Sequence, residues 1–141
     1  PIIDTRSTLE TIGKTLYERR AQLLSERGFG LTRAYNLLHS PSEASVDLAE
    51  VRRLHVEMDQ AVAAAYGWQN LDLGHGFHET KQGIRYTISE TARREVLDRL
   101  LTLNHQRYAE EETEKAVLPV SASVKRSRKP KDTGVQITMD L

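Results

Sequence analysis

Residues 46–68 read VDLAEVRRLHVEMDQAVAAAYGW, and their apolar side chains recur three and four positions apart. This spacing places them on one stripe of an α-helix. The stripe consists of Leu48, Val51, Leu54, Met58, Ala61, Val62 and Ala65. Gly67 follows it, and glycine readily adopts the left-handed conformation that ends a helix. We therefore expect a helix over residues 46–65, with Trp68 folding back on its last turn.

Two helices are expected before this stretch. Ser7 and Glu10 fit a capping box, which predicts a helix from Ser7 to about Glu26. Its apolar stripe consists of Leu9, Ile12, Leu16 and Leu23. Gly28 then ends the helix, and a shorter helix is expected over residues 32–38.

After Trp68 the hydrophobic period changes from 3.6 to 2, which is typical of strands. Two strands are expected at 76–80 and 84–88, joined by a turn at 81–83. The inward-facing side chains of the second strand would be those of Ile84, Tyr86 and Ile88. The side chains of Arg85 and Thr87 would then face outward.

A last helix is expected from Glu90 to about Lys115. Its buried stripe would consist of Ala92, Val96, Leu97, Leu100, Leu103 and Tyr108. The predicted fold is therefore mainly α, a small helical domain of about four helices with one β-hairpin near 76–88. We expect this domain to span residues 1–118 and a basic, loosely held tail to span 119–141, with one possible strand at 135–139.

The charges of the chain are unevenly distributed, although 20 Lys and Arg balance 20 Asp and Glu. Residues 119–141 contain five basic and two acidic side chains, a formal charge of +3, so residues 1–118 carry −3. The five basic residues are Lys125, Arg126, Arg128, Lys129 and Lys131. A basic tail on a mildly acidic body suits contact with an anionic polymer, and it equally suits a solvated terminus.

Several classes of protein are excluded by composition and motif. The chain has no cysteine, which excludes disulfide scaffolds and thiolate zinc sites. It has no apolar run that could span a membrane and no signal peptide, so we expect a cytoplasmic domain without a membrane partner. Signatures of a nucleophile elbow, a phosphate-binding loop and a dinucleotide-binding turn are missing as well, so no catalytic, cofactor-binding or metal-binding residue is expected.

The densest group of possible metal ligands is His75, His78 and Glu79. Metalloproteases place two histidines four residues apart on a helix so that both rings face one ion. This segment is interrupted by glycine and reads as the start of a strand, where His75 and His78 would point to opposite faces. A structural or hydrogen-bonding role is therefore favoured over a metal site.

Several strings together resemble the C-terminal region of large bacterial adenine-specific DNA methyltransferases, of the type IIG restriction–modification class and of BREX phage defence. The strings are LYERR at 16–20, GLTRAYNLLHSP at 30–41, LHVEMDQAV at 54–62, AYGW at 65–68, GFHETKQG at 76–83 and RYAEE at 107–111. The resemblance extends over roughly residues 8–112. It implies a parent enzyme that transfers a methyl group from S-adenosylmethionine to adenine N6.

The catalytic part of that family is not found in this sequence. The family's Asn-Pro-Pro-aromatic motif and glycine-rich cofactor loop are both missing, so no catalytic or cofactor residue can be assigned here. The resemblance, with Pro1 in place of a Met, predicts a C-terminal accessory domain that contacts double-stranded DNA beside the catalytic core of the same polypeptide.

The candidate DNA contacts are Lys81 and Arg85 of the hairpin, with the five basic residues of the tail. The alternative is a domain that contacts no DNA and instead braces the methyltransferase core or binds a protein partner. For that alternative, Met58, Trp68 and Phe77 are the candidate docking residues.

Overall fold

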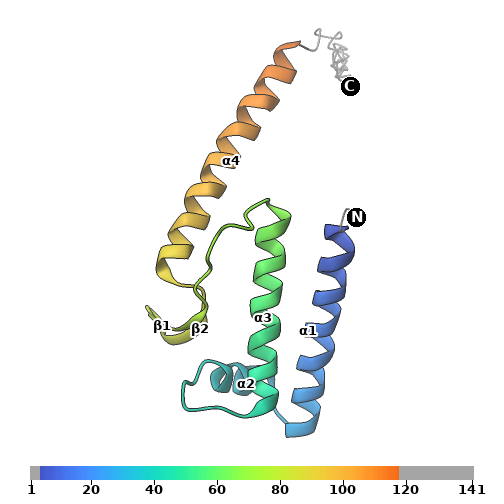
Figure 1. The fold of residues 1–141 in the computed structure, drawn as a ribbon, viewed down its shortest axis with the longest axis vertical. Helices are drawn as coiled ribbons and strands as arrows, with labels where there is room; N and C mark the ends of the chain where they lie inside the picture. Colours follow the sequence, from blue (N-terminus) through green and yellow to red (C-terminus); the bar gives the residue numbers. More distant parts are fainter. Residues whose placement is uncertain (1–3, 118–141) are drawn as a thin grey trace, which may run out of the picture. The chain divides into compact units, whose positions relative to one another are not determined.

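The structure, a computed structural model, describes residues 4–117 of the chain. In this part, three helices precede a two-stranded antiparallel sheet and one helix follows it (Figure 1). The elements are α1 (Thr5–Arg27), α2 (Leu31–Leu38), α3 (Val46–Ala65), β1 (Gly76–Thr80), β2 (Gly83–Thr87) and α4 (Glu90–Val117). The prediction of a mainly α fold with four helices and one hairpin is confirmed. The expected tail, with its five basic residues and possible strand, lies outside the described residues.

Helix α1 begins earlier than the capping box predicts. Asp4 is the N-cap, and its carboxylate accepts a hydrogen bond from the backbone N–H of Arg6 at 3.2 Å. Ser7 therefore lies inside the helix, and Glu10 accepts from the side chain of Arg6 at 3.1 Å instead of capping the helix. The prediction of Ser7 as the cap is wrong because Asp4, three residues upstream, supplies an equally good acceptor.

Helix α3 has the predicted bounds, and its C-terminus has the predicted geometry. Gly67 has a φ of 78°, a left-handed conformation. The N–H of Trp68 donates to the carbonyl of Ala63 at 2.9 Å, and that of Gly67 donates to Ala64 at 2.9 Å, as in a Schellman motif. The ring of Trp68 stacks on Tyr66 with centroids 4.6 Å apart.

The hydrophobic core lies among the first three helices. Helices α1 and α3 run antiparallel side by side, and α2 crosses near one end of the pair (Figure 1). The buried cluster consists of Leu23, Ala34, Leu38, Leu48 and Val51. Leu48 is the most deeply buried of them, with 1% of its surface exposed.

One charged residue, Arg52 of α3, is also buried. Its guanidinium donates to the carbonyl oxygens of Leu37, Leu38, Ser40 and Glu43 at 2.7–3.1 Å. These carbonyls belong to the last turn of α2 and the loop after it, where the helix itself supplies no donors. Arg52 thus fixes the C-terminus of α2 against α3.

The two strands pair with a register that brings Phe77 opposite Tyr86 and His78 opposite Arg85. The strands follow the predicted segments, but β2 begins at Gly83, which has a φ of 97° and pairs with Thr80. The turn therefore contains only two unpaired residues. The guanidinium of Arg52 lies over both the Phe77 and Tyr86 rings, at 5.1 and 5.8 Å from their centroids, so this face of the hairpin rests on the helices.

Two predictions about the side chains of β2 are wrong. Ile84 was expected to point inward, yet 49% of its surface is exposed near the end of the hairpin. Arg85 was expected to point outward, yet it is half-buried. The hairpin is too short to be covered along its whole length, and its second face also meets the helical body.

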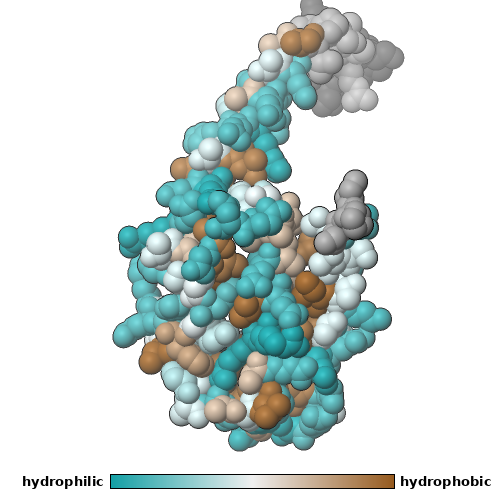
Figure 2. Space-filling view, in the orientation of Figure 1, coloured by the Kyte–Doolittle hydropathy of each residue, from teal (hydrophilic) through white to brown (hydrophobic). Residues whose placement is uncertain are grey.

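Helix α4 begins after Ser89, whose hydroxyl accepts from the backbone N–H of Ala92 at 3.1 Å. The predicted buried stripe on α4 is wrong at two of its six residues and only half-buried at three others. Ala92 is buried and Val96, Leu100 and Leu103 are half-buried, whereas Leu97 and Tyr108 are 56% and 62% exposed. Leu101, which lies outside the predicted stripe, is 56% exposed as well. Apolar side chains accordingly interrupt the hydrophilic surface of this helix (Figure 2). Contacts divide the chain into two units, Pro1–Thr102 and Leu103–Leu141, and α4 runs from the first into the second.

None of the helices between residues 4 and 117 has both the length and the apolar character needed to cross a membrane.

Candidate functional site

The two predicted DNA contacts of the hairpin have different environments. Lys81 is exposed in the turn, and no carboxylate of residues 4–117 pairs with it. Arg85 lies on β2, and its Nε is shielded from solvent with no hydrogen-bond partner in the described chain. Lys81 is thus free to meet a phosphate in solvent, whereas Arg85 belongs to a partly enclosed group of side chains.

That group, which we call the Tyr35 cluster, brings together side chains from four elements. Its members are Arg20 of α1, Tyr35 of α2, His39 at the end of α2, His55 of α3 and Arg85 of β2. All five are half-buried, so each keeps some access to solvent.

Hydrogen bonds in the cluster fix the orientation of Tyr35. A guanidinium N–H of Arg20 donates to the Tyr35 hydroxyl oxygen at 3.4 Å. The same oxygen lies 3.2 Å from Nε2 of His55. Because arginine can only donate, the single proton of the Tyr35 hydroxyl is available to His55, whose Nε2 then accepts it. The result is a chain of hydrogen bonds from Arg20 through Tyr35 to His55.

His39 joins the hairpin to the helices. The backbone N–H of Tyr86 donates to Nδ1 of His39 at 3.1 Å. Since Nδ1 is the acceptor, the neutral ring carries its proton on Nε2. His39 therefore presents one N–H donor to its surroundings while its other nitrogen holds β2 in position.

The pKa values of both histidines in the cluster are lowered. Burial lowers the pKa of His39, and the charge of Arg85, His55 and Arg52 lowers it further. Burial also lowers the pKa of His55, where Asp59 acts in the opposite direction and Arg20 in the same one. Both pKa values therefore lie below the ordinary 6.5, and positive charge dominates around His39.

The histidines singled out in the sequence, His75 and His78, have separate hydrogen-bond partners. Nε2 of His75 lies 2.8 Å from a carboxylate oxygen of Asp59, and Nε2 of His78 lies 2.8 Å from the carbonyl of Gly74. Glu79 is the next residue along β1 and so points to the other face of the hairpin from His78. Within residues 4–117, no three His, Asp or Glu side chains come together as a metal site.

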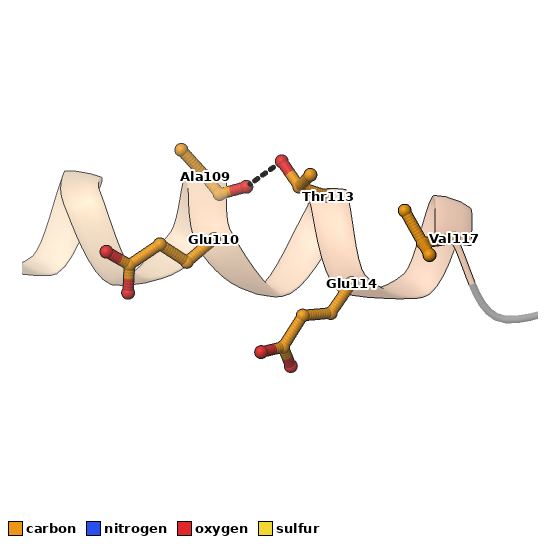
Figure 3. Close-up of a pocket in the computed structure, with 5 residues that line it drawn as sticks. All are labelled: Ala109, Glu110, Thr113, Glu114 and Val117. Carbon is orange, nitrogen blue, oxygen red and sulfur yellow. Dashed lines mark hydrogen bonds between the residues drawn. The ribbon is translucent and has the colours of Figure 1, made fainter.

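A pocket on the second unit of the chain has a different chemistry. Figure 3 shows its lining along the last turns of α4: Ala109, Glu110, Thr113, Glu114 and Val117. The Thr113 hydroxyl donates to the carbonyl of Ala109 at 2.8 Å, and both charged side chains are carboxylates. All five residues are exposed, and two negative charges would repel a phosphate.

Sequence reasoning did not find most of the Tyr35 cluster. Arg20, Tyr35, His39 and His55 occur in the sequence analysis only inside the strings of the resemblance, where they have no role of their own. The available signal was local, because Tyr35 and His39 are four residues apart on one helical face. What joins them to α1, α3 and β2 is tertiary packing.

Comparisons of the chain with family models, curated proteins and solved structures return no match. The resemblance to adenine methyltransferases is therefore one of short strings of residues alone, as quoted above.

Proposed function

We propose that the chain is a DNA-contacting accessory domain of an adenine-N6 DNA methyltransferase from a restriction–modification or phage-defence system. The resemblance over residues 8–112 suggests the enzyme class. The observation that carries the DNA contact is the exposed Lys81, which lies on the turn of the hairpin without a carboxylate partner among residues 4–117. Such a side chain can reach a phosphate without first breaking an ion pair.

The chemistry of base methylation explains why an accessory contact is useful. An enzyme that modifies a base in a duplex must extrude that base and hold the DNA on either side of it. Contacts to phosphates set the register of the protein on the duplex without reading the sequence. In this proposal, S-adenosylmethionine binds to the catalytic core of the same polypeptide, and the enzyme acts on DNA in the cytoplasm.

The proposal is tested by binding of the 141-residue chain to non-specific duplex DNA at a series of salt concentrations. Each phosphate contact contributes about −0.9 to the slope of log affinity against log salt. The substitution Lys81→Gln should therefore make the slope about 0.9 less negative. The matched control is Lys14→Gln, because Lys14 is also exposed but pairs with Glu18 on α1. Equal slopes for the two variants would remove Lys81 from the interface.

The basic tail is tested in the same assay by deleting residues 119–141. If the five cations of the tail and Lys81 together neutralise about four phosphates, the intact chain should show a slope of roughly −3.6. A shallower slope after deletion would assign phosphate contacts to the tail. An intact chain without salt-dependent binding would contradict the proposal as a whole.

A second candidate function, docking on the methyltransferase core, is favoured by one observation. Leu97 and Leu101 are more than half exposed and lie four residues apart on α4, so they share one face. The substitution Leu101→Glu should abolish association with a separately produced core if this face is the interface. The control Thr102→Glu changes the neighbouring position and should leave association intact.

A further inference from the structure

We propose that Arg20, His39 and Arg85 of the Tyr35 cluster bind a phosphate group. The inference deepens the proposed function and rests on it for one point only, the identification of DNA as the source of the phosphate. The binding chemistry itself depends on this chain alone.

The first argument is that these three side chains offer hydrogen-bond donors and no free acceptors. Nδ1 of His39 is occupied by the backbone N–H of Tyr86, so the ring offers an Nε2 proton. The guanidinium groups of Arg20 and Arg85 offer further protons and cannot accept any. These donors come from three different elements, which suits a ligand with several acceptor oxygens around one centre.

The second argument is the charge around the cluster. Neither Arg20 nor Arg85 pairs with a carboxylate among residues 4–117. The guanidinium of Arg52 adds a third positive charge near His39, although its own protons are taken by backbone carbonyls. An anion would relieve the mutual repulsion of these groups, whereas a metal cation would add to it.

The nearest acidic group is already engaged elsewhere. Asp59 acts on His55 from the next turn of α3, and its carboxylate also lies 2.8 Å from Nε2 of His75. No carboxylate of the described residues acts on the pKa of His39 to a comparable degree, since only burial and positively charged groups shift it. The cluster therefore retains an excess of positive charge on the side of His39 and Arg85.

The third argument is that Arg20 and Arg85 are partly ordered before a ligand arrives. Arg20 is held by its hydrogen bond to Tyr35, and the Nε of Arg85 is shielded from solvent without a partner. A buried N–H without an acceptor is costly, so the hydrogen-bonding capacity of the Arg85 guanidinium is not met by residues 4–117 at its Nε. Preorganised donors lose little side-chain entropy on binding.

The experiment uses nuclear magnetic resonance of the intact chain, recording the ring signals of His39 and the Nε–H signal of Arg85. Sodium phosphate is titrated against sodium chloride at matched ionic strength. We expect saturable shifts of both signals in phosphate and none in chloride, with the His105 ring on α4 unmoved. The comparison needs no variant, so a loss of folding cannot obscure it.

Variants then assign the contacts. Arg85→Gln and Arg20→Gln should each weaken phosphate binding by about tenfold, the loss of one charge-assisted hydrogen bond. Arg33→Gln is the control, because Arg33 also has no carboxylate partner among the described residues and lies over Phe29, outside the cluster. Arg20→Lys should restore part of the affinity, since it keeps the charge.

A short duplex without terminal phosphates distinguishes the two sources of the ligand. If the duplex produces the same shifts and competes with inorganic phosphate, the site binds the DNA backbone. If the duplex binds the chain but leaves His39 unmoved, the phosphate site stands and its ligand is a free phosphate or a phosphomonoester. Absence of any shift of His39 and Arg85 in phosphate overturns the inference, even where salt-dependent DNA binding supports the proposed function.

Discussion

The helical body formed by α1, α2 and α3 and the long helix α4 are stabilised in opposite ways. The body buries a cluster that includes Leu23 and Leu48, and the buried Arg52 donates hydrogen bonds to backbone carbonyls at the end of α2. Along its 28 residues, α4 buries only Ala92. Its charged side chains instead form ion pairs three or four residues apart, as between Glu90 and Arg94. The body is therefore stabilised by contacts between its helices, whereas α4 depends largely on interactions between residues close together in the chain.

The largest expected effect is on the free energy of unfolding. It compares truncation of a buried leucine in the body with truncation of an exposed leucine on α4. Leu48→Ala should lower the free energy of unfolding by about 3 kcal/mol, because it removes apolar contacts and leaves a cavity in the core. Leu101→Ala, the same change on α4, should cost less than about 0.5 kcal/mol at an exposed site. Urea denaturation followed by circular dichroism measures both. Similar costs at the two positions would contradict the comparison.

A somewhat smaller effect is expected from the buried arginine of the body. Arg52→Met should cost roughly 2 kcal/mol, because backbone carbonyls at the end of α2 lose their donor. Its neighbour provides the matched control. Arg53 is exposed and pairs only with glutamates on α3, so Arg53→Met should change stability by less than about 0.5 kcal/mol. A large loss in the control would mean that ion pairs on the surface also hold the body together.

The pH dependence of stability should be concentrated in the body. His39 and His55 have pKa values below 6.5 in the folded chain, so on acidification the unfolded chain takes up protons before the folded chain does. The free energy of unfolding should therefore fall as the pH drops through about 6.5 and on to the lower pKa values of the folded chain. Unfolding measured at several pH values should show this fall, and His55→Gln should reduce it. A variant with an unchanged profile would exclude His55 as a cause.

The smallest expected effect is the coupling energy within an ion pair. Double-mutant cycles measure it for one pair in the body and one pair on α4. Arg27 binds Asp47 through two hydrogen bonds, at 2.6 and 2.5 Å, between α1 and α3. Glu90 and Arg94 are one turn apart on α4 and well exposed, so their coupling should be about 0.3 kcal/mol. The coupling of the first pair should exceed this value and should vanish in acid. Hydrogen bonds from Arg27 lower the pKa of Asp47, so this stability is present above the ordinary pKa and is lost as the pH falls through the lowered one.

Local sequence signals predicted most of the fold. The bounds of α3, its Schellman motif at Gly67 and the pairing of two short strands all depend on residues close together in the chain. Apart from the N-cap of α1, which is Asp4 and not Ser7, the errors concern what covers an element. The predicted stripe on α4 has helical spacing from Ala92 to Leu103, but periodicity alone cannot say whether another surface covers it.

The candidate site was harder to predict from the sequence, because its residues are brought together by contacts between distant parts of the chain. The exposure of Lys81 could be predicted because a turn exposes its side chains, whereas the orientation of Arg85 was predicted wrongly. Tyr35 and His55 are twenty residues apart on different helices, and His39 meets Tyr86 across 47 positions. Only tertiary packing brings such residues together.

The stacking of Trp68 gives the chain a natural optical reporter. It is the only tryptophan in the sequence, and its ring lies against Tyr66 with the guanidinium of Arg99 at 5.8 Å from its centroid. Indole fluorescence responds to such neighbours, so the emission of Trp68 should change when the first turns of α4 leave the end of α3. Separation of these two helices can therefore be timed by stopped-flow mixing without attaching a label.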